Sequence, residues 1–101
     1  MTYIKLGSVR AFPHAKPDKA QALKVLEEAS ETVEAFKQHS EAVAYDPECV
    51  YAESSHRGLM DEIADTIQAC CNLAAALGVT DLTPYLARCE ERNRRRGRYG
   101  E

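Results

Sequence analysis

Two short runs of acidic residues carry the clearest chemistry in this sequence. Glu28 and Glu31 lie three positions apart, and Glu62 and Asp65 repeat that spacing further along the chain. On an α-helix, residues three apart share one face, so each pair could bind the same cation. Mg²⁺ suits such a site, because it prefers oxygen ligands and bridges protein carboxylates to substrate phosphates. A run of glutamates is also typical of an ordinary solvated helix face, so spacing alone leaves both interpretations open.

The sequence around the first acidic pair has the pattern of an amphipathic helix. Asp18 can cap its start, with Gln21 in the capping-box position, and we expect the helix to run to about Gln38. Glu28 falls at the edge of the apolar stripe, so it should face a neighbouring helix rather than open water. The stripe predicted to be buried consists of Ala22, Val25, Leu26, Ala29, Val33 and Phe36.

A second helix should carry the other acidic pair. The Ser54-Ser55 dipeptide offers a cap, and we predict a helix from about His56 to Leu77 that ends at Gly78. Glu62 also lies at the edge of the apolar stripe, which places it toward a neighbouring helix. The buried face predicted for this helix consists of Leu59, Ile63, Ile67, Cys70, Ala74 and Leu77.

The rest of the chain supplies connections and a third helix. Residues 39–55 are predicted to form a loop with at most a short helical turn, because Asp46-Pro47 interrupts any continuous helix. Thr83-Pro84 marks the start of a third helix that should run to about Arg95. Residues 1–17 predict either a short strand or an extended arm. We therefore expect an all-α fold, a small bundle with three main helices in each chain.

Length and composition favour one small domain. The 101 residues would form an arm at 1–17, a helical core at 18–96 and a tail at 97–101. A monomer of this size buries only a modest core, which oligomerisation would enlarge. No apolar stretch reaches the ~18 residues of a membrane span, and the N-terminus lacks the pattern of a secretory signal, so we expect a cytoplasmic protein. The four cysteines form no CxxC pair and are expected to be reduced.

Taken together, the two acidic motifs resemble those of the MazG-like all-α nucleoside triphosphate pyrophosphohydrolases. The signature of that family is EExxE on one helix and ExxD on the next. Here the two motifs are Glu27-Glu28-Ala29-Ser30-Glu31 and Glu62-Ile63-Ala64-Asp65. The resemblance covers roughly residues 19–96, and the ending CEERNRRRG is similar to the charged close of the family's third helix. The 30 residues between the half-motifs are slightly more than the family usually shows, which predicts a lengthened connecting loop.

The resemblance implies a hydrolase that cleaves a nucleoside triphosphate to the monophosphate and pyrophosphate. Glu28, Glu31, Glu62 and Asp65 would bind Mg²⁺, or Mn²⁺ in its place. The related phosphoribosyl-ATP pyrophosphatases typically carry a histidine after the second motif, where this chain has Thr66-Ile67-Gln68. Nucleoside triphosphates are therefore the expected substrates.

Other residues are candidates for catalysis and substrate contact. Glu27 points about 100° away from Glu28 on the helix and could act as a general base or support the metal ligands. Lys24 and Arg95 are candidates for phosphate contacts, and Asn72 for the ribose or base. A solvated helix end rich in arginine and an ordinary exposed asparagine would give the same sequence pattern.

Members of the resembled family complete their sites by pairing chains, which implies a homodimer or homotetramer here. The main alternative is a non-enzymatic helical adaptor or regulator that binds nucleotide or nucleic acid through its C-terminus. A family member that binds nucleotide without hydrolysing it is a third interpretation. The net charge of −3 argues against a dedicated nucleic-acid binder. The C-terminal cationic residues are Arg88, Arg92, Arg94, Arg95, Arg96 and Arg98.

Overall fold

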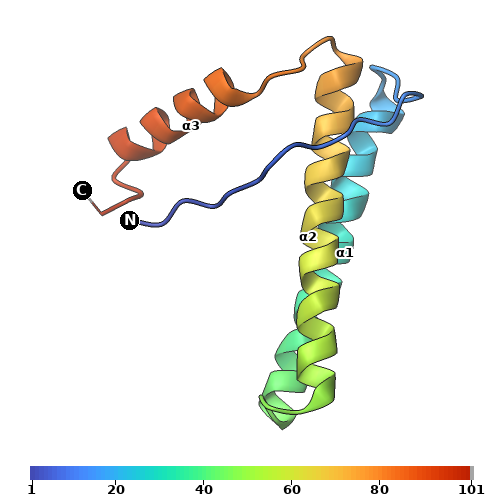
Figure 1. Ribbon diagram of the computed structural model, residues 1–101, viewed down its shortest axis with the longest axis vertical. Helices are drawn as coiled ribbons and strands as arrows, with labels where there is room; N and C mark the ends of the chain where they lie inside the picture. The colour runs from blue at the N-terminus through green and yellow to red at the C-terminus, as the bar shows by residue number, and fades with distance from the viewer. Residues whose placement is uncertain (101) are drawn as a thin grey trace.

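The protein folds into three α-helices, α1 (Lys19–Tyr45), α2 (Val50–Ala76) and α3 (Thr83–Arg95), in a computed structural model that describes residues 1–100. Figure 1 shows α1 and α2 side by side as a long antiparallel hairpin, with the N-terminal segment crossing α2. The prediction of an all-α fold is confirmed. The alternative of a short N-terminal strand is wrong, because residues 1–12 are extended but no residue in 1–100 pairs with them as a strand.

The hairpin turn is shorter than predicted, since both helices extend into the segment expected to be a loop. The side chain of Asp18 caps α1 as expected, with its Oδ1 accepting from the Gln21 N–H at 2.9 Å. α1 then continues past Gln38 to Tyr45, and α2 begins at Val50. The predictions of a loop at residues 39–55 and of a second helix that begins at His56 are therefore wrong. The extra residues between the acidic motifs lie in longer helices instead of a longer loop.

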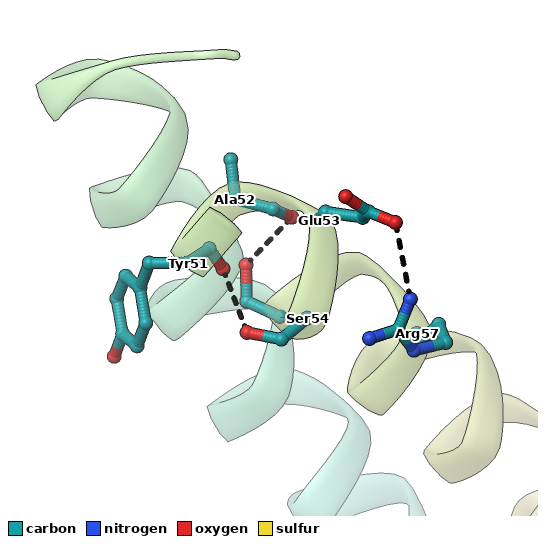
Figure 2. Close-up of polar contacts among 6 residues, drawn as sticks. Tyr51, Ala52, Glu53, Ser54 and Arg57 are labelled. Carbon is teal, nitrogen blue, oxygen red and sulfur yellow. Dashed lines mark hydrogen bonds and ion pairs between the residues drawn. The ribbon is translucent and has the colours of Figure 1, made fainter. Parts of the chain in front are cut away.

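The serines predicted to cap the second helix lie inside it. The Ser54 hydroxyl donates to the Tyr51 carbonyl at 3.2 Å, as Figure 2 shows, and the Ser55 hydroxyl donates to the Ala52 carbonyl at 3.1 Å. Serine hydroxyls satisfied in this way are compatible with a helix interior. The N-cap is Cys49, whose Sγ accepts from the Ala52 N–H at 3.3 Å.

Small side chains form the contact between α1 and α2. The hydrophobic residues buried in the structure are Ala35, Ala42, Ala52, Leu59 and Ala69. In contrast, the predicted α1 stripe is exposed at Leu26 (66%), Val33 (61%) and Phe36 (58%). The prediction that these large residues pack inside the chain was wrong, because alanines let the two helices approach on the adjacent face. Within α2 the prediction holds for Leu59 but fails for three residues that are exposed, Ile63, Cys70 and Leu77.

In each helix one series of buried and half-buried positions recurs at alternating spacings of three and four, which is the repeat of a coiled-coil seam, while others such as Ala29 and Ile67 lie beside it. In α1 they are Val25, Glu28, Thr32, Ala35, His39 and Ala42. In α2 they are Ala52, Ser55, Leu59, Glu62, Thr66 and Ala69. One glutamate of each acidic pair therefore lies in the seam between the helices.

α3 stands apart from the hairpin. Gly78, in the left-handed region with φ +85°, follows α2 as predicted, and α3 covers the expected residues. No Cα atom of α3 lies within 8 Å of one in α1 or α2. The radius of gyration is 16.4 Å, against about 13 Å for a compact domain of 100 residues. Figure 1 shows α3 extending away from the end of α2, with the N-terminal segment approaching its far end.

Two amide side chains of α2 hold the N-terminal segment against the hairpin. The Oδ1 atom of Asn72 accepts from the Phe12 N–H at 2.9 Å and from Gln68 Nε2 at 2.8 Å. Gln68 Nε2 also donates to the Arg10 carbonyl at 2.9 Å. Asn72 is only 3% exposed, so these bonds satisfy a polar group that would otherwise be costly to bury. None of the helices in residues 1–100 is long and apolar enough to span a membrane.

Candidate metal centre

The hairpin brings acidic residues of both helices together at the middle of its length. One carboxylate oxygen from each of Glu28, Glu62 and Asp65 lies within 4.8 Å of the others. Glu31 lies outside this trio, but its charge acts on both Glu28 and Glu62. Antiparallel packing therefore places the two acidic pairs, distant in sequence, at one site. We call these four residues the acidic cluster.

The clearest sign that the acidic cluster lacks a partner is at Glu62. Its Oε2 atom is inaccessible to solvent, and none of the described residues forms a hydrogen bond with it. Among residues 1–100, no lysine or arginine forms an ion pair with any member of the cluster. A buried carboxylate oxygen without a hydrogen bond or counterion is unfavourable. A bound cation would satisfy it.

The surroundings of the acidic cluster oppose ionisation. Burial raises the pKa of the Glu62 carboxyl above its ordinary value of 4.5, and the nearby carboxylates of Glu31 and Asp65 raise it further. Burial also raises the pKa of Glu28, with Glu31 the next largest cause. Both shifts have the sign expected when like charges share a partly desolvated site. The folded chain thus holds these carboxylates together at an electrostatic cost.

Two threonines, which sequence reasoning missed, fix the register of the helices beneath the acidic cluster. Thr32 Oγ1 lies 3.0 Å from Thr66 Oγ1 and 3.1 Å from the carbonyl oxygens of Glu28 and Glu62. Thr66 Oγ1 donates to the Glu62 carbonyl at 3.0 Å. A hydroxyl has one proton, so Thr32 donates to one of these acceptors at a time. The pair joins the backbones that carry the two glutamates.

A repeated sequence pattern could have identified these threonines. Residues 28–32 read Glu-Ala-Ser-Glu-Thr and residues 62–66 read Glu-Ile-Ala-Asp-Thr, so both helices carry Glu-x-x-acid-Thr. Each threonine is followed three positions later by a buried alanine, Ala35 or Ala69. Since equivalent threonines meet in an antiparallel pair, an approximate two-fold axis passes between them. The axis relates residues 19–42 of α1 to residues 53–76 of α2, each 34 positions later.

Replacing Thr32 with valine, which keeps the shape and removes the hydroxyl, should lower the free energy of unfolding by about 1 kcal/mol. Urea unfolding followed by circular dichroism measures this change. Thr80→Val is the control, since Thr80 is exposed in the loop before α3. Equal stabilities for the two variants would show that the threonine contact does not hold the helices in register.

The other predicted site residues lie outside the acidic cluster. Glu27 and Lys24 are both more than half exposed and pair with each other at 3.1 Å. Asn72 is buried, and its Oδ1 atom is bonded to the N-terminal segment. Arg95 lies on α3, with its Nε 3.7 Å from Glu91. The structure thus brings together three of the four predicted metal ligands, with Glu31 beside them, but does not bring Arg95 to them within one chain.

No family model and no curated protein matches the sequence, and no solved structure matches the fold.

Proposed function

We propose that this chain is a cytoplasmic, magnesium-dependent nucleotide pyrophosphohydrolase that cleaves nucleoside triphosphates to monophosphates and pyrophosphate. The observation that carries the proposal is the unpartnered Glu62 Oε2 atom within a cluster of four carboxylates. The MazG-like sequence motifs supply the reaction, because the same four residues form the EExxE and ExxD pairs. The alternative of a bare solvated helix face does not account for a carboxylate oxygen that is buried without a partner.

The residues of the acidic cluster fit a divalent cation. They offer only carboxylate oxygens, which Mg²⁺ and Mn²⁺ accept and which softer metals favour less. Glu28, Glu62 and Asp65 would be direct ligands, and Glu31 would be a fourth ligand or a neighbour that adds negative charge. When bound, Mg²⁺ would supply neutralisation of the phosphate charge and activation of a water molecule.

The contribution of the chain itself is positioning. Thr32 and Thr66 hold α1 and α2 at one register, so the two acidic pairs keep their relative places through a cycle of binding and release. Because phosphoryl chemistry needs little covalent help from a protein, such positioning and charge placement account for most of the expected acceleration. Glu27 and Lys24 border the cluster on α1, where Lys24 could exchange its exposed ion pair for a phosphate contact.

The exposed apolar face of the hairpin supports assembly into a homodimer or homotetramer. It includes Leu26, Val33 and Phe36 of α1, all more than half exposed. Several large apolar side chains exposed along one helix are typical of a surface that pairs with another molecule. Light scattering should give two or four times the 11.2 kDa of one chain, and Phe36→Glu should reduce it. Lys37→Glu, at an exposed position outside the stripe, is the control, and a monomeric wild type would contradict this expectation.

The adaptor alternative retains one supporting observation, the separation of the arginine-rich α3 from the hairpin. Salt-sensitive retention on single-stranded nucleic acid would favour it. The direct test of the proposed function is to incubate the purified chain with a panel of ribo- and deoxyribonucleoside triphosphates and Mg²⁺, and to measure pyrophosphate release. Release that stops with EDTA is the expected result. No release from any nucleotide would overturn the proposal.

A further inference from the structure

A groove leads away from the acidic cluster between α1 and α2, toward the hairpin turn. Its volume is about 250 Å³, and Glu62 forms one end of it. Ligand pockets for whole small molecules are usually about 300–1,000 Å³, so this groove suits one part of a ligand whose remainder lies outside. The residues that line it are Ala35, Gln38, Tyr51, Ser54, Ser55, Gly58 and Glu62.

Gly58 keeps this groove open. It lies in the interior of α2, where glycine is unfavourable relative to alanine. Its backbone has no positive φ, and a Cβ atom added there would meet nothing within 4 Å. Neither backbone conformation nor packing within the chain therefore requires a glycine. The space that its missing side chain leaves is available to something outside the chain.

The chemistry of the lining indicates which part of a substrate enters. No lysine or arginine lines the groove, so it offers no cationic partner for a phosphate chain. Apart from Glu62, the polar groups that line it are neutral. Ser54 donates to the Tyr51 carbonyl, which leaves its oxygen free to accept, and the Gln38 amide can both donate and accept. Figure 2 shows the Tyr51 ring projecting from the first turn of α2.

We propose that this groove binds the nucleoside part of the substrate, while the acidic cluster holds the phosphates. The inference rests on the proposed function. Sugar hydroxyls and base edges match the neutral polar groups of Gln38 and Ser54, and the small residues Ala35 and Gly58 let a flat ring approach the helix backbones. Glu62 belongs to both the groove and the acidic cluster, so a bound nucleotide would extend across both regions at this residue.

Filling the groove tests the inference. Gly58→Leu should raise KM for the nucleoside triphosphate at least about tenfold, with Gly58→Ala intermediate, because the added side chain occupies the space of the nucleoside. Inhibition by inorganic pyrophosphate with Mg²⁺, a probe without a nucleoside, should be unchanged. Ala44→Leu is the control, since Ala44 is an exposed alanine of α1 that neither lines the groove nor belongs to the acidic motifs.

The outcomes separate the inference from the function on which it rests. An active wild type with the same KM in Gly58→Leu would overturn the groove assignment and leave the pyrophosphohydrolase intact. If Gly58→Leu weakened inhibition by pyrophosphate as much as it raised KM, the groove assignment would also be overturned. The substitution would then be acting on the acidic cluster and not on the nucleoside. A wild type that releases no pyrophosphate would overturn the proposed function itself. A melting temperature of Gly58→Ala at or above wild type would show that the effects do not come from unfolding.

Discussion

Replacing Glu62 with glutamine should lower the rate of pyrophosphate release by at least about 100-fold while the helical hairpin stays folded. Charge stabilisation by a bound metal ion is worth several kcal/mol, and each step of about 1.4 kcal/mol changes a rate tenfold. Glu62 is central to the acidic cluster, because its carboxylate is the one with a buried oxygen that has no partner. Glutamine keeps the size of the side chain and removes the charge.

The same substitution should raise the melting temperature in EDTA, since it removes one of several like charges held together. That increase distinguishes a lost metal site from a damaged fold, which would melt earlier. Glu34→Gln is the control, because Glu34 is exposed on α1 and pairs only with Lys37, at 3.6 Å. A wild-type rate in Glu62→Gln would rule out the acidic cluster as the catalytic centre. A lost rate with a lowered melting temperature would point to misfolding instead.

The second large effect concerns pH and Mg²⁺. Without metal, the chain should become more stable as the pH falls from neutral through the raised pKa values of Glu28 and Glu62 toward 4.5, their ordinary value. Because these pKa values are higher in the folded state, that state binds more protons than the unfolded chain in this window, and stability must fall as the pH rises. The lowered pKa of Asp81 acts in the opposite sense only below 3.8.

Thermal melts across this pH range, in EDTA and in Mg²⁺, measure the effect. Mg²⁺ should raise the melting temperature most at neutral pH, where the carboxylates are ionised, and little near pH 4.5, where protons compete with it. In Glu62→Gln the pH dependence in EDTA should be shallower than in wild type. A melting temperature in EDTA that rises with pH over this range would contradict the shared burial and repulsion described for the cluster.

Local chemistry was enough to predict where most helices begin and end. Asp18 acts through its bond to the Gln21 N–H, Gly78 through its left-handed backbone, and Pro84 through its fixed φ in the first turn, so the sequence contains the information needed. The hairpin turn was misjudged for a related reason. Serine is a good cap, but it can also bond to a carbonyl one turn back inside a helix, and only the folded chain decides between these uses.

The interface between α1 and α2 was harder to predict, because α1 has two faces that could pack. The stripe containing Leu26, Val33 and Phe36 is the more hydrophobic, yet the chain packs on the adjacent face, where alanines permit close approach. Periodicity identifies a helix and its apolar side, but it does not say whether that side meets the same chain or another one. Large apolar residues that stay exposed in a small domain are the ones we expect to pack against another chain.

Spacing predicted only that each acidic pair could share a cation, since three-residue intervals need only helical geometry, and the resemblance to the MazG-like family joined the two pairs into one predicted site. The depth of that site was not predicted. The burial of Glu62 and the contact between Thr32 and Thr66 depend on the relative register of two helices, which no single helix can encode. The matching Glu-x-x-acid-Thr patterns were the available signal, and they become meaningful only when the two helices are known to be antiparallel.

The approximate two-fold axis of the hairpin also gives the site a direction. Glu28 corresponds to Glu62 and Glu31 to Asp65, since each pair is 34 positions apart. The α1 end and the α2 end of the acidic cluster therefore have similar backbone geometry and similar carboxylates. The two ends differ one helical turn before Glu28 and Glu62, where α1 carries Lys24 and α2 carries Gly58. At this position one end has a cationic side chain and the other has none. This difference would favour one orientation for an elongated anion, with its most charged end toward Lys24.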